Sequence, residues 1–551
     1  MSIKQVFLLA GAFFLIYVAP LGIRPLFIPD ETRYAEVPRE MRATGDWIVP
    51  RLNGFLYFEK PALGYWLNAV SQEVLGENRF AARLPSALAA GLSVLSIWLL
   101  LGRRKNEDPA VAGIAGAFFL LCPLVFMCGT YAILDGPFSA FFTLAMALFF
   151  RGFTEESPQT KRRFYAAFGV ASGLAFLTKG LLGLALPILV IVPFMLGQRK
   201  AGELFRFPWV PLFLALAVVL PWALAIHFRD SDFWRYFIWH EHLQRFFDPA
   251  GSEQHPEPFW FFVPVLVGGA FPLLFLLPAA IAGLRRSWKE PMVAFCLLWL
   301  GLVFAFFSAS SGKLGTYILP CFPPLAILVA LGAYRYLQSG QKRLFDAGAQ
   351  GLGGLVLIAL LGVAALQWLP FPAAWRIFSR IETARWILGS VALLVWAVVV
   401  FRGARGATPL RKLALYAAAP AVALAGFSGI VPDLACAGKA PLPLLERNAS
   451  RVCPDSLLVT SSHLVGALNW QYRRTDVTIV RGAGELAYGM GRAPNDQRLV
   501  SLEEIGDFAA AHAGQGRLTL FLKDSSYAEL EPMLPPPRHL DRDAGFTFAQ
   551  F

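Results

Sequence analysis

The sequence predicts a membrane protein built almost entirely of α-helices, with a small α/β domain at its carboxyl end. Hydrophobic residues make up 56% of the 551 residues, whereas charged residues make up only 16%. Soluble domains usually carry about 25% charged residues. The apolar residues also gather into runs long enough to cross the roughly 30 Å hydrocarbon core of a bilayer. These observations exclude a water-soluble enzyme, a disordered chain and a collagen-like protein.

Thirteen apolar runs are candidates for transmembrane helices. The first follows Lys4, as in a signal peptide, but no small-residue cleavage site ends it before Pro20, so we expect an uncleaved helix. Lys179 alone separates the fifth run from the sixth. The runs cover residues 6–23, 84–102, 110–128, 135–152, 164–178, 180–197, 208–227, 258–283, 291–308, 317–337, 350–369, 385–402 and 412–432.

Basic residues lie in alternate gaps between the runs. The net charge is +12, but the basic residues form no cluster on one face, which argues against nucleic-acid binding. Cytoplasmic loops are enriched in Lys and Arg, so gaps such as 103–105 and 161–163 are predicted to face the cytoplasm. The amino terminus is then cytoplasmic, and the carboxyl terminus is outside. Loops 24–83 and 228–257 become external, and their tryptophans predict amphipathic helices in the membrane interface.

The composition changes sharply after the last run. Short β-rich runs alternate there with helical patterns such as Ser501–Ala511, in which Ser501 is a plausible N-cap. This alternation predicts a small external α/β domain over residues 433–551, following a membrane domain over 1–432. The β-rich runs are Ser456–Thr460, Val477–Val480 and Leu518–Leu522.

Two of the six cysteines lie in this external domain. Cys436 and Cys453 are separated by a loop that contains proline. An oxidising compartment favours a disulfide between them, and two free thiols are the alternative. The other four cysteines lie in or beside apolar runs, where a reduced, packed thiol is expected.

Acidic residues follow the first run directly. A carboxylate next to a span pays a desolvation penalty unless it is paired or hydrated, so it usually marks a functional site. Asp30 is therefore a predicted catalytic residue, and the alternative is a helix-capping role with Arg33 as its partner. Asp135 begins the fourth run on the same predicted side. It is a second catalytic candidate, again with N-capping as the alternative.

Three lysines lie on the predicted external side, against the usual charge bias. Lys60, Lys179 and Lys313 could simply extend their ammonium groups to water. Several cations on one face would instead form an anion site. With Arg245 from the second long loop, these residues are predicted to bind phosphate groups.

Histidines are concentrated around the second long loop. His240 and His242 are two positions apart, so they do not share a helical face. One of them could bind a zinc-like divalent ion together with Glu59. The alternative is that each histidine is an ordinary polar residue at the surface.

Several motifs together resemble a known family. They are Phe58–Pro61, Arg79–Pro85, Thr178–Gly180 and Lys313–Pro320, with the acidic residues after the first run. Their order and the topology are similar to the integral-membrane C-type glycosyltransferases, and most closely to the bacterial 4-amino-4-deoxy-L-arabinose transferases that modify lipid A. The resemblance covers the spans and early loops, about 430 residues.

The resemblance implies a function. The donor would be undecaprenyl phosphate-aminoarabinose, the acceptor a lipid A phosphate, and the anomeric centre would be inverted at an external site, without a nucleotide cofactor. The enzyme would lie in a bacterial inner membrane with its tail in the periplasm, and would confer resistance to polymyxin and other cationic antimicrobial peptides. Asp30 matches the family's catalytic first-loop acid. The candidate substrate-binding residues are Arg33, Tyr34, Glu59, Lys60, Lys179, Arg245, Lys313 and Tyr317.

Other functions stay open at this point. A related transferase could act on a protein or another glycan, and in that case a hydroxyl acceptor would need Asp30 as a general base. A phosphate acceptor is already largely a dianion at neutral pH, so Asp30 would instead orient it or balance the charge of the transition state. A lipid-linked-sugar transporter is the alternative of another class, but transporters tend to contain internal repeats and we find none. A binding scaffold is the third possibility.

Overall fold

The computed structural model describes residues 3–102, 108–244, 257–369, 376–514 and 516–551. It divides into two compact units. Unit 1 comprises the residues up to Leu21 together with Leu84–Ile430, and unit 2 comprises Gly22–Arg83 together with Val431–Phe551. The first external loop, predicted to belong to the membrane domain, is grouped with the tail in the structure.

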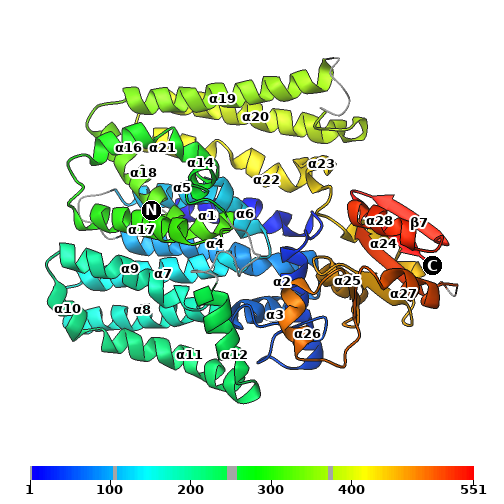
Figure 1. Cartoon of the computed structure of the whole chain (residues 1–551). Helices are drawn as coiled ribbons and strands as arrows, with labels where there is room; N and C mark the ends of the chain where they lie inside the picture. Colours follow the sequence, from blue (N-terminus) through cyan, green and yellow to red (C-terminus); the bar gives the residue numbers. More distant parts are fainter. Residues whose placement is uncertain (1–2, 103–107, 245–256, 370–375, 515) are drawn as a thin grey trace. The chain divides into compact units, whose positions relative to one another are not determined.

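Every element described in unit 1 is helical, and Figure 1 shows its long helices running side by side. Helix follows helix with short connections because apolar runs alternate with brief polar gaps. The elements are α1 (Ile3–Phe13), η1 (Phe14–Val18), η2 (Ala19–Gly22), α4 (Arg79–Leu101), α5 (Ala110–Leu121), α6 (Pro123–Thr130), α7 (Asp135–Thr154), α8 (Pro158–Lys179), α9 (Leu182–Gly197), α10 (Ala201–Arg206), α11 (Trp209–Arg229), α12 (Asp232–Trp234), η3 (Arg235–Gln244), α14 (Phe262–Gly269), α15 (Phe271–Leu274), α16 (Leu277–Leu284), α17 (Pro291–Ala309), η4 (Gly315–Cys321), α18 (Phe322–Gln338), α19 (Arg343–Trp368), η6 (Arg380–Glu382), α20 (Thr383–Ala404), α21 (Pro409–Ala418) and α22 (Ala421–Ile430).

The protein is a multi-pass membrane protein. In the described ranges, eight helices are long and apolar enough to cross a membrane, and the pair α5–α6, bent by 73°, would make a ninth span. The thirteen predicted spans are therefore not confirmed. The run 258–283 shows why, because Pro272 and Pro278 stand in the first turns of α15 and α16 and divide the run into three short helices.

Helices α8 and α11 approach each other closely. Gly169 and Gly173 lie four positions apart on α8, facing the backbone of α11. A Cβ atom at Gly173 would lie only 2.9 Å from the carbonyl oxygen of Ala215, and one at Gly169 would overlap Pro211. Small residues at this spacing allow two helix backbones to pack directly in a membrane. The packing fixes α8, which ends at Lys179.

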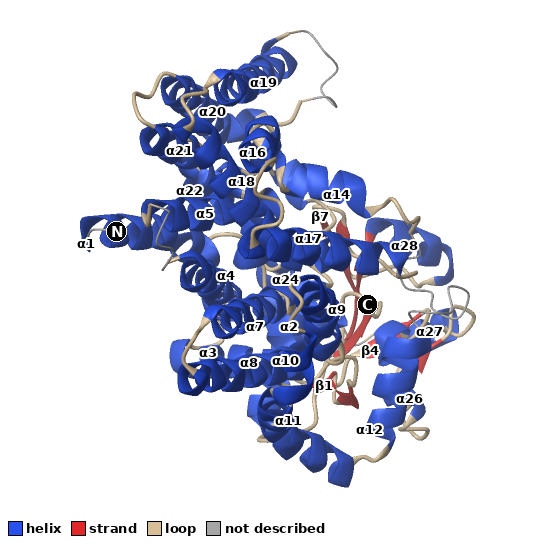
Figure 2. Ribbon diagram, turned by 90° about the vertical axis from the view of Figure 1, so that its left-hand side faces the viewer, coloured by secondary structure: helices blue, strands red, loops and turns tan. Residues whose placement is uncertain are grey.

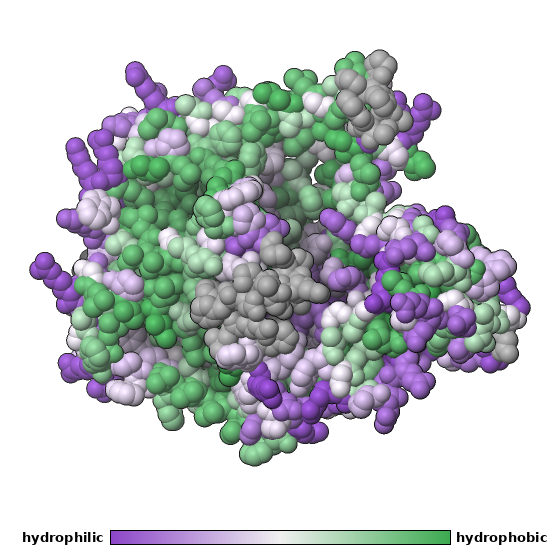
Figure 3. Space-filling model, viewed as in Figure 1, coloured by the Kyte–Doolittle hydropathy of each residue, from purple (hydrophilic) through white to green (hydrophobic). Residues whose placement is uncertain are grey.

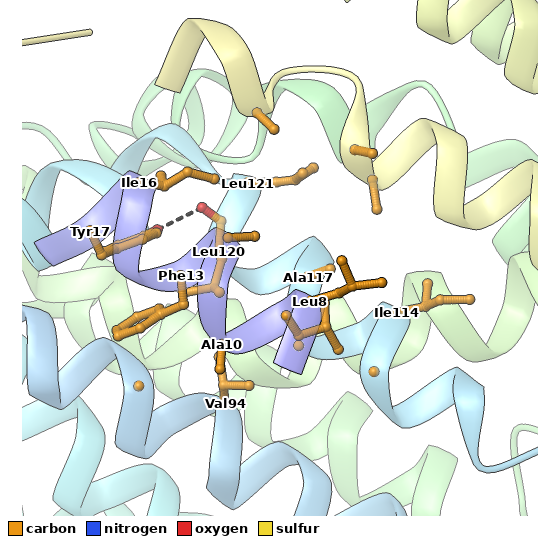
Figure 4. A pocket seen from close by; sticks show the side chains of 18 of the residues that line it. Leu8, Ala10, Phe13, Ile16, Tyr17, Val94, Ile114, Ala117, Leu120 and Leu121 are labelled. Carbon is orange, nitrogen blue, oxygen red and sulfur yellow. Dashed lines mark hydrogen bonds between the residues drawn. The ribbon is translucent and has the colours of Figure 1, made fainter. Parts of the chain in front are cut away.

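An apolar groove of about 840 Å³ lies among α1, α4, α5 and α21, and Figure 4 shows its carbon-rich lining. The hydroxyl of Tyr17 is already bonded to the carbonyl oxygen of Leu120 at 2.6 Å. No charged residue of the described chain lines this groove. Figure 3 shows the same apolar character across the outer face of the helices. The groove therefore suits hydrocarbon chains, and the charged chemistry lies elsewhere.

The tail in unit 2 contains a six-stranded sheet in the order β5-β4-β3-β6-β8-β7, drawn in red in Figure 2. Strands β5, β4, β3 and β6 are parallel, and β8 and β7 continue the sheet in antiparallel pairing. The three predicted β-rich runs form β3, β4 and β6. The strands are β3 (Leu457–Thr460), β4 (Thr478–Val480), β5 (Leu499–Val500), β6 (Leu518–Lys523), β7 (His539–Asp543) and β8 (Phe546–Gln550).

Short helices cover this sheet and enclose a core that includes Val459, Leu520 and Tyr527. The predicted helix at Ser501 begins later than expected. Ser501 accepts a hydrogen bond from the amide of Glu504 at 3.2 Å and so caps a turn ahead of α27. The helices are α23 (Asp433–Cys436), α24 (Leu442–Arg447), η7 (Ala449–Arg451), α25 (Val465–Tyr472), η8 (Gly484–Leu486), α26 (Ala487–Gly491), α27 (Ile505–His512), α28 (Asp524–Leu530) and η9 (Glu531–Met533).

The predicted disulfide is not present: both Cys436 and Cys453 lie in the described chain, and no bond joins them. Two residues after Cys436, the amide of Gly438 donates to Ala544 in the β7–β8 turn, beside the end of β6. Cys453 instead precedes the start of β3, which is aligned with the beginning of β6. Five residue steps along β6 span roughly 17 Å, whereas the Cα atoms of a disulfide lie within about 7 Å.

The first loop contributes α2 (Asp30–Thr44), the strand pair β1 (Arg51–Leu52) and β2 (Phe55–Leu56), and α3 (Leu63–Leu75) to unit 2. Helix α2 is buried although it is rich in charge, because its charged side chains are paired with one another or with neighbouring segments of unit 2. Glu31 is fully buried and receives hydrogen bonds from Arg24 and Arg83 at 2.6–3.1 Å. Burial raises the pKa of Glu31, but the charges and hydrogen bonds of these arginines reverse this and lower it to about 2.

The hairpin between β1 and β2 joins α2 to the tail. Asn53 and Gly54 have φ angles of 57° and 77°, as expected of an Asn-Gly hairpin turn. The carboxylate of Glu40 accepts both of their amide hydrogens, at 2.6 and 3.0 Å. The side chain of Asn53 then bonds the carbonyl and amide of Val477 at 2.8 and 3.0 Å. The first loop and the tail thus share buried backbone hydrogen bonds.

We predict that Glu31→Gln strongly destabilises unit 2. It would leave two buried arginines without their counter-charge, at a cost of about 3–5 kcal/mol. Urea unfolding of the purified protein in detergent, followed by protease susceptibility of the tail, measures this loss. Glu73→Gln is the control, because Glu73 forms an exposed pair with Arg42 and should cost less than about 1 kcal/mol.

The same carboxylate gives a pH dependence with a definite sign. Its folded pKa of about 2 lies below the ordinary value of 4.5, so its stabilising contribution is complete above about pH 4.5 and is lost as the pH falls towards 2. The stability difference between wild type and Glu31→Gln should shrink across that window. A difference that is the same at pH 3 and pH 7 would contradict this role of Glu31.

Candidate active site

In unit 2 the predicted catalytic acid is the first residue of α2. The Asp30 carboxylate is paired with Arg33, one helical turn later, and within the described chain this is its only side-chain partner. The N-cap position is occupied by Pro29, which makes no side-chain capping bond. The Asp30 side chain is 45% exposed, whereas that of Arg33 is 9% exposed. Asp30 is therefore an accessible carboxylate beside a buried cation.

Arg33 has a second carboxylate partner, Glu485, which comes from the tail. Its guanidinium also lies over the ring of Tyr34, 5.0 Å from the centroid. The buried hydroxyl of Tyr57 donates to Glu485 at 2.9 Å. Burial alone would lower the pKa of Arg33, but neighbours that include Tyr57, Tyr34 and Asp30 hold it above its ordinary value. The cluster therefore carries a permanent positive charge at its centre.

Glu59 and Lys60 lie in the same unit and interact with each other. Glu59 is 5% exposed. The Lys60 ammonium lies 4.0 Å from the Glu59 carboxylate and donates to the Glu59 carbonyl at 2.7 Å. The side chains of His240 and His242, the other predicted metal ligands, lie outside the described residues. In the parts of the chain described, no three acidic, histidine or cysteine side chains form a metal-binding group, so the metal site stays a prediction.

In unit 1 a second cluster joins three predicted residues. Asp135 is the first residue of α7, and its carboxylate pairs with the ammonium of Lys179 at 2.5 Å. That ammonium also lies over the ring of Tyr317, 4.3 Å from the centroid. Lys179 and the Asp135 side chain are largely buried. Asp135 is thus held by a cation from the end of α8. The N-capping alternative is not supported, because the N-cap of α7 is Leu134 and no side chain caps this helix.

Lys313 is bound by two backbone carbonyl groups, one from its own loop and one from the segment before α14. It is 3% exposed, and its ammonium donates to the carbonyl oxygens of Glu257, at 2.8 Å, and Ser310. Burial lowers the pKa of Lys313 below its ordinary value. Arg245 lies outside the described residues. For both residues, phosphate binding stays a prediction.

Glu485 and Tyr57 belong to the cluster around Arg33 but are not among the site residues predicted from the sequence. Tyr57 immediately precedes the quoted motif at Phe58–Pro61 and could have been included with it. Glu485 stands in Gly484-Glu485-Leu486, which matches no motif, and it is 452 positions from its partner Arg33. No local pattern could have connected the two.

Two family models match the chain. Residues 2–237 match the family described as dolichyl-phosphate-mannose-protein mannosyltransferase, and residues 436–550 match the arabinosyl transferase ArnT, C-terminal domain. With the long helices of unit 1 and the charged clusters, these matches define an integral-membrane glycosyltransferase of the C type.

Similarity to individual proteins extends along the whole chain. The undecaprenyl phosphate-α-4-amino-4-deoxy-L-arabinose arabinosyl transferase of Shewanella sediminis is 38% identical over 90% of this chain and 89% of its own length. The enzyme of that name from Edwardsiella ictaluri is 37% identical over 99% and 98%. The crystal structure of ArnT from Cupriavidus metallidurans bound to undecaprenyl phosphate is 26% identical, with a TM-score of 0.82 and coverage of 100% and 98%. The chain belongs to this arabinosyl transferase family.

We predict that Asp135 and Lys179 are energetically coupled. Asp135→Asn and Lys179→Met should each reduce donor affinity and thermal stability. Their double variant should recover part of the stability, because it removes both buried charges together. A double-mutant cycle on the melting temperature and on KM measures the coupling, expected at about 0.5–3 kcal/mol for stability. Additive losses in both measurements would show that the pair does not act as a unit.

Proposed function

We propose that this protein transfers 4-amino-4-deoxy-L-arabinose from undecaprenyl phosphate to a phosphate group of lipid A. The observation that carries the proposal is similarity along the whole chain, tail included, to enzymes named for this donor. The exposed Asp30 beside buried Arg33 supplies chemistry that suits such a transfer. The product would carry an added amine on lipid A, which reduces its negative charge and hence its attraction for polymyxin and other cationic peptides.

The reaction needs one bond to form and one to break. An oxygen of the acceptor phosphate attacks the anomeric carbon, while the bond from that carbon to the carrier phosphate breaks. The carrier phosphate leaves with the bonding electrons as undecaprenyl phosphate, and direct displacement inverts the anomeric centre. A phosphate monoester has its second pKa near 6, so neither the nucleophile nor the leaving group needs a strong acid or base.

The chain's own residues then serve mainly for charge balance and alignment. Asp30 would orient the acceptor or stabilise positive charge developing on the sugar ring. Arg33 and Lys60 supply positive charge in unit 2. Lys179, stacked on Tyr317, supplies it in unit 1.

The proposed location is the bacterial inner membrane. The basic gaps place the amino terminus in the cytoplasm, so that Asp30 and the tail would lie in the periplasm. Lipid A in the outer leaflet of this membrane would then present its phosphates to the same side as the donor.

Purified protein in nanodiscs provides the direct test of function. We expect transfer of aminoarabinose from its undecaprenyl phosphate donor to lipid A, detected as the corresponding mass increase of lipid A. Acceptor peptides should receive no sugar, and dephosphorylated lipid A should receive none. Transfer to peptides, or transfer that does not depend on the acceptor phosphate, would overturn the proposal.

We predict that Asp30→Asn reduces turnover by about a hundredfold or more, the scale of one lost electrostatic or acid–base group. The amide keeps the shape and can still accept a hydrogen bond, so folding and donor retention should change little. Glu73→Gln, a change of the same kind at an exposed position of the same loop, serves as the control. A folded Asp30→Asn protein with normal turnover would reduce Asp30 to a partner of Arg33.

A further inference from the structure

The charges around Arg33 are divided in an unusual way. A guanidinium can bind one carboxylate through two parallel hydrogen bonds, which is its strongest arrangement. Here one terminal nitrogen of Arg33 meets Asp30 and the other meets Glu485. Neither carboxylate therefore has the guanidinium to itself. Asp30 is left half exposed, with one oxygen outside this pairing.

Glu485 is fixed by its surroundings. It lies in η8, between Gly484 and Leu486, and Leu486 is 1% exposed. Gly484 has a φ of +53°, and a Cβ there would lie 2.7 Å from the hydroxyl of Ser462. The next helix, α26, packs on the first loop, where the ring of Tyr488 lies 5.6 Å from that of Phe58. The tail thus holds the Glu485 backbone in place within unit 2.

Tyr57 gives Glu485 a second attachment to the first loop. Its hydroxyl is buried and donates to the same carboxylate oxygen that meets Arg33. A charge and a hydrogen bond therefore converge on this oxygen from two different segments. Such a contact holds the Glu485 carboxylate in one orientation.

The size of the space beside Glu485 bears on whether Glu485 binds substrate directly or acts through Arg33. A cavity of about 20 Å³ is lined by Arg33, Ser462, His463 and Glu485, among others. A cavity of this size holds roughly one water molecule, whereas ligand pockets for small molecules are about 300 Å³ or more. The cavity is too small to hold a sugar, and the charged contact that Glu485 makes is its ion pair with Arg33. We therefore expect Glu485 to act through Arg33.

We propose that Glu485 of the tail is a positioning residue for Asp30: by sharing Arg33, it prevents a closed Asp30–Arg33 pair and keeps the Asp30 carboxylate open to substrate. The proposal rests on the proposed function for its catalytic consequence. Its structural part, the accessibility of Asp30, stands independently. The tail is then part of the active site's machinery and more than an accessory domain.

Kinetic measurements test the catalytic consequence. Glu485→Gln should lower kcat about tenfold to a hundredfold, the scale of a small misplacement of a reacting group, with KM changed less than threefold. Glu485→Asp, which keeps the charge, should recover most of the rate. Glu529→Gln is the matched control, because Glu529 pairs with Arg481 at the exposed surface of the same tail, and its activity should equal that of wild type.

A double-mutant cycle separates positioning from simple folding. If Glu485 acts through Arg33, then Arg33→Gln combined with Glu485→Gln should be no slower than Arg33→Gln alone. If the fold-losses in kcat of the two single variants instead multiply in the double variant, the proposal is overturned. So would a Glu485→Gln protein with the kcat of wild type and an unchanged melting temperature.

Chemical labelling tests the structural part without any sugar transfer. A water-soluble carbodiimide with glycine ethyl ester modifies accessible carboxyls, and mass spectrometry gives the rate at Asp30 relative to exposed Glu73. In Glu485→Gln, Arg33 should turn fully to Asp30, and relative labelling of Asp30 should fall at least threefold. Unchanged labelling would overturn the inference. If wild type transfers no aminoarabinose but this labelling falls, the proposed function fails and the inference on Asp30 holds.

Discussion

A single buried carboxylate organises the first loop. Glu31 lies between Arg24, near the beginning of the loop, and Arg83, near its end, and it binds both. A charge without water must be paired to be tolerated, so the loop can close only with α2 in one orientation. That orientation presents Asp30 and Arg33, which flank Glu31 along α2. The same pairing that makes the helix tolerable inside the protein therefore determines where its functional residues lie.

The tail depends on this arrangement in turn. Glu40 of α2 holds the Asn53-Gly54 turn, and the turn's asparagine bonds the backbone of Val477. On the other side, Glu485 meets Arg33 and Tyr57. Polar contacts of this kind are directional and demand partners, unlike apolar packing. They define how the loop and the tail join within unit 2, and they explain why a helix so rich in charge is buried.

The sequence predicted the membrane class and three of the six strands of the tail, because hydropathy and β-propensity are local properties. It also predicted most residues of the two charged clusters, because each of these residues stands out by its charge or its motif. The breaks in the run 258–283 could not be predicted from its length. Its prolines do not interrupt the apolar character of the sequence, although each of them stands at the start of a new short helix. The prediction of a disulfide was wrong for another reason. Proximity of Cys436 and Cys453 in sequence gave no information about which end of β6 each would occupy. Glu485 was missed because its meaning depends wholly on Arg33, which is distant in sequence.

Unit 2 is built from two stretches that are far apart in the sequence, so the ribosome makes them at different times. The first stretch, Gly22–Arg83, is made before about 350 residues of unit 1, and the second stretch follows them. At roughly 5–20 residues per second, the first loop waits on the order of tens of seconds for its partner. During that interval Asn53 and Arg33 lack their partners in the tail, Val477 and Glu485, because these have not yet been synthesised. A nascent chain thus carries Asp30 early but completes its surroundings only with about the last fifth of the polypeptide.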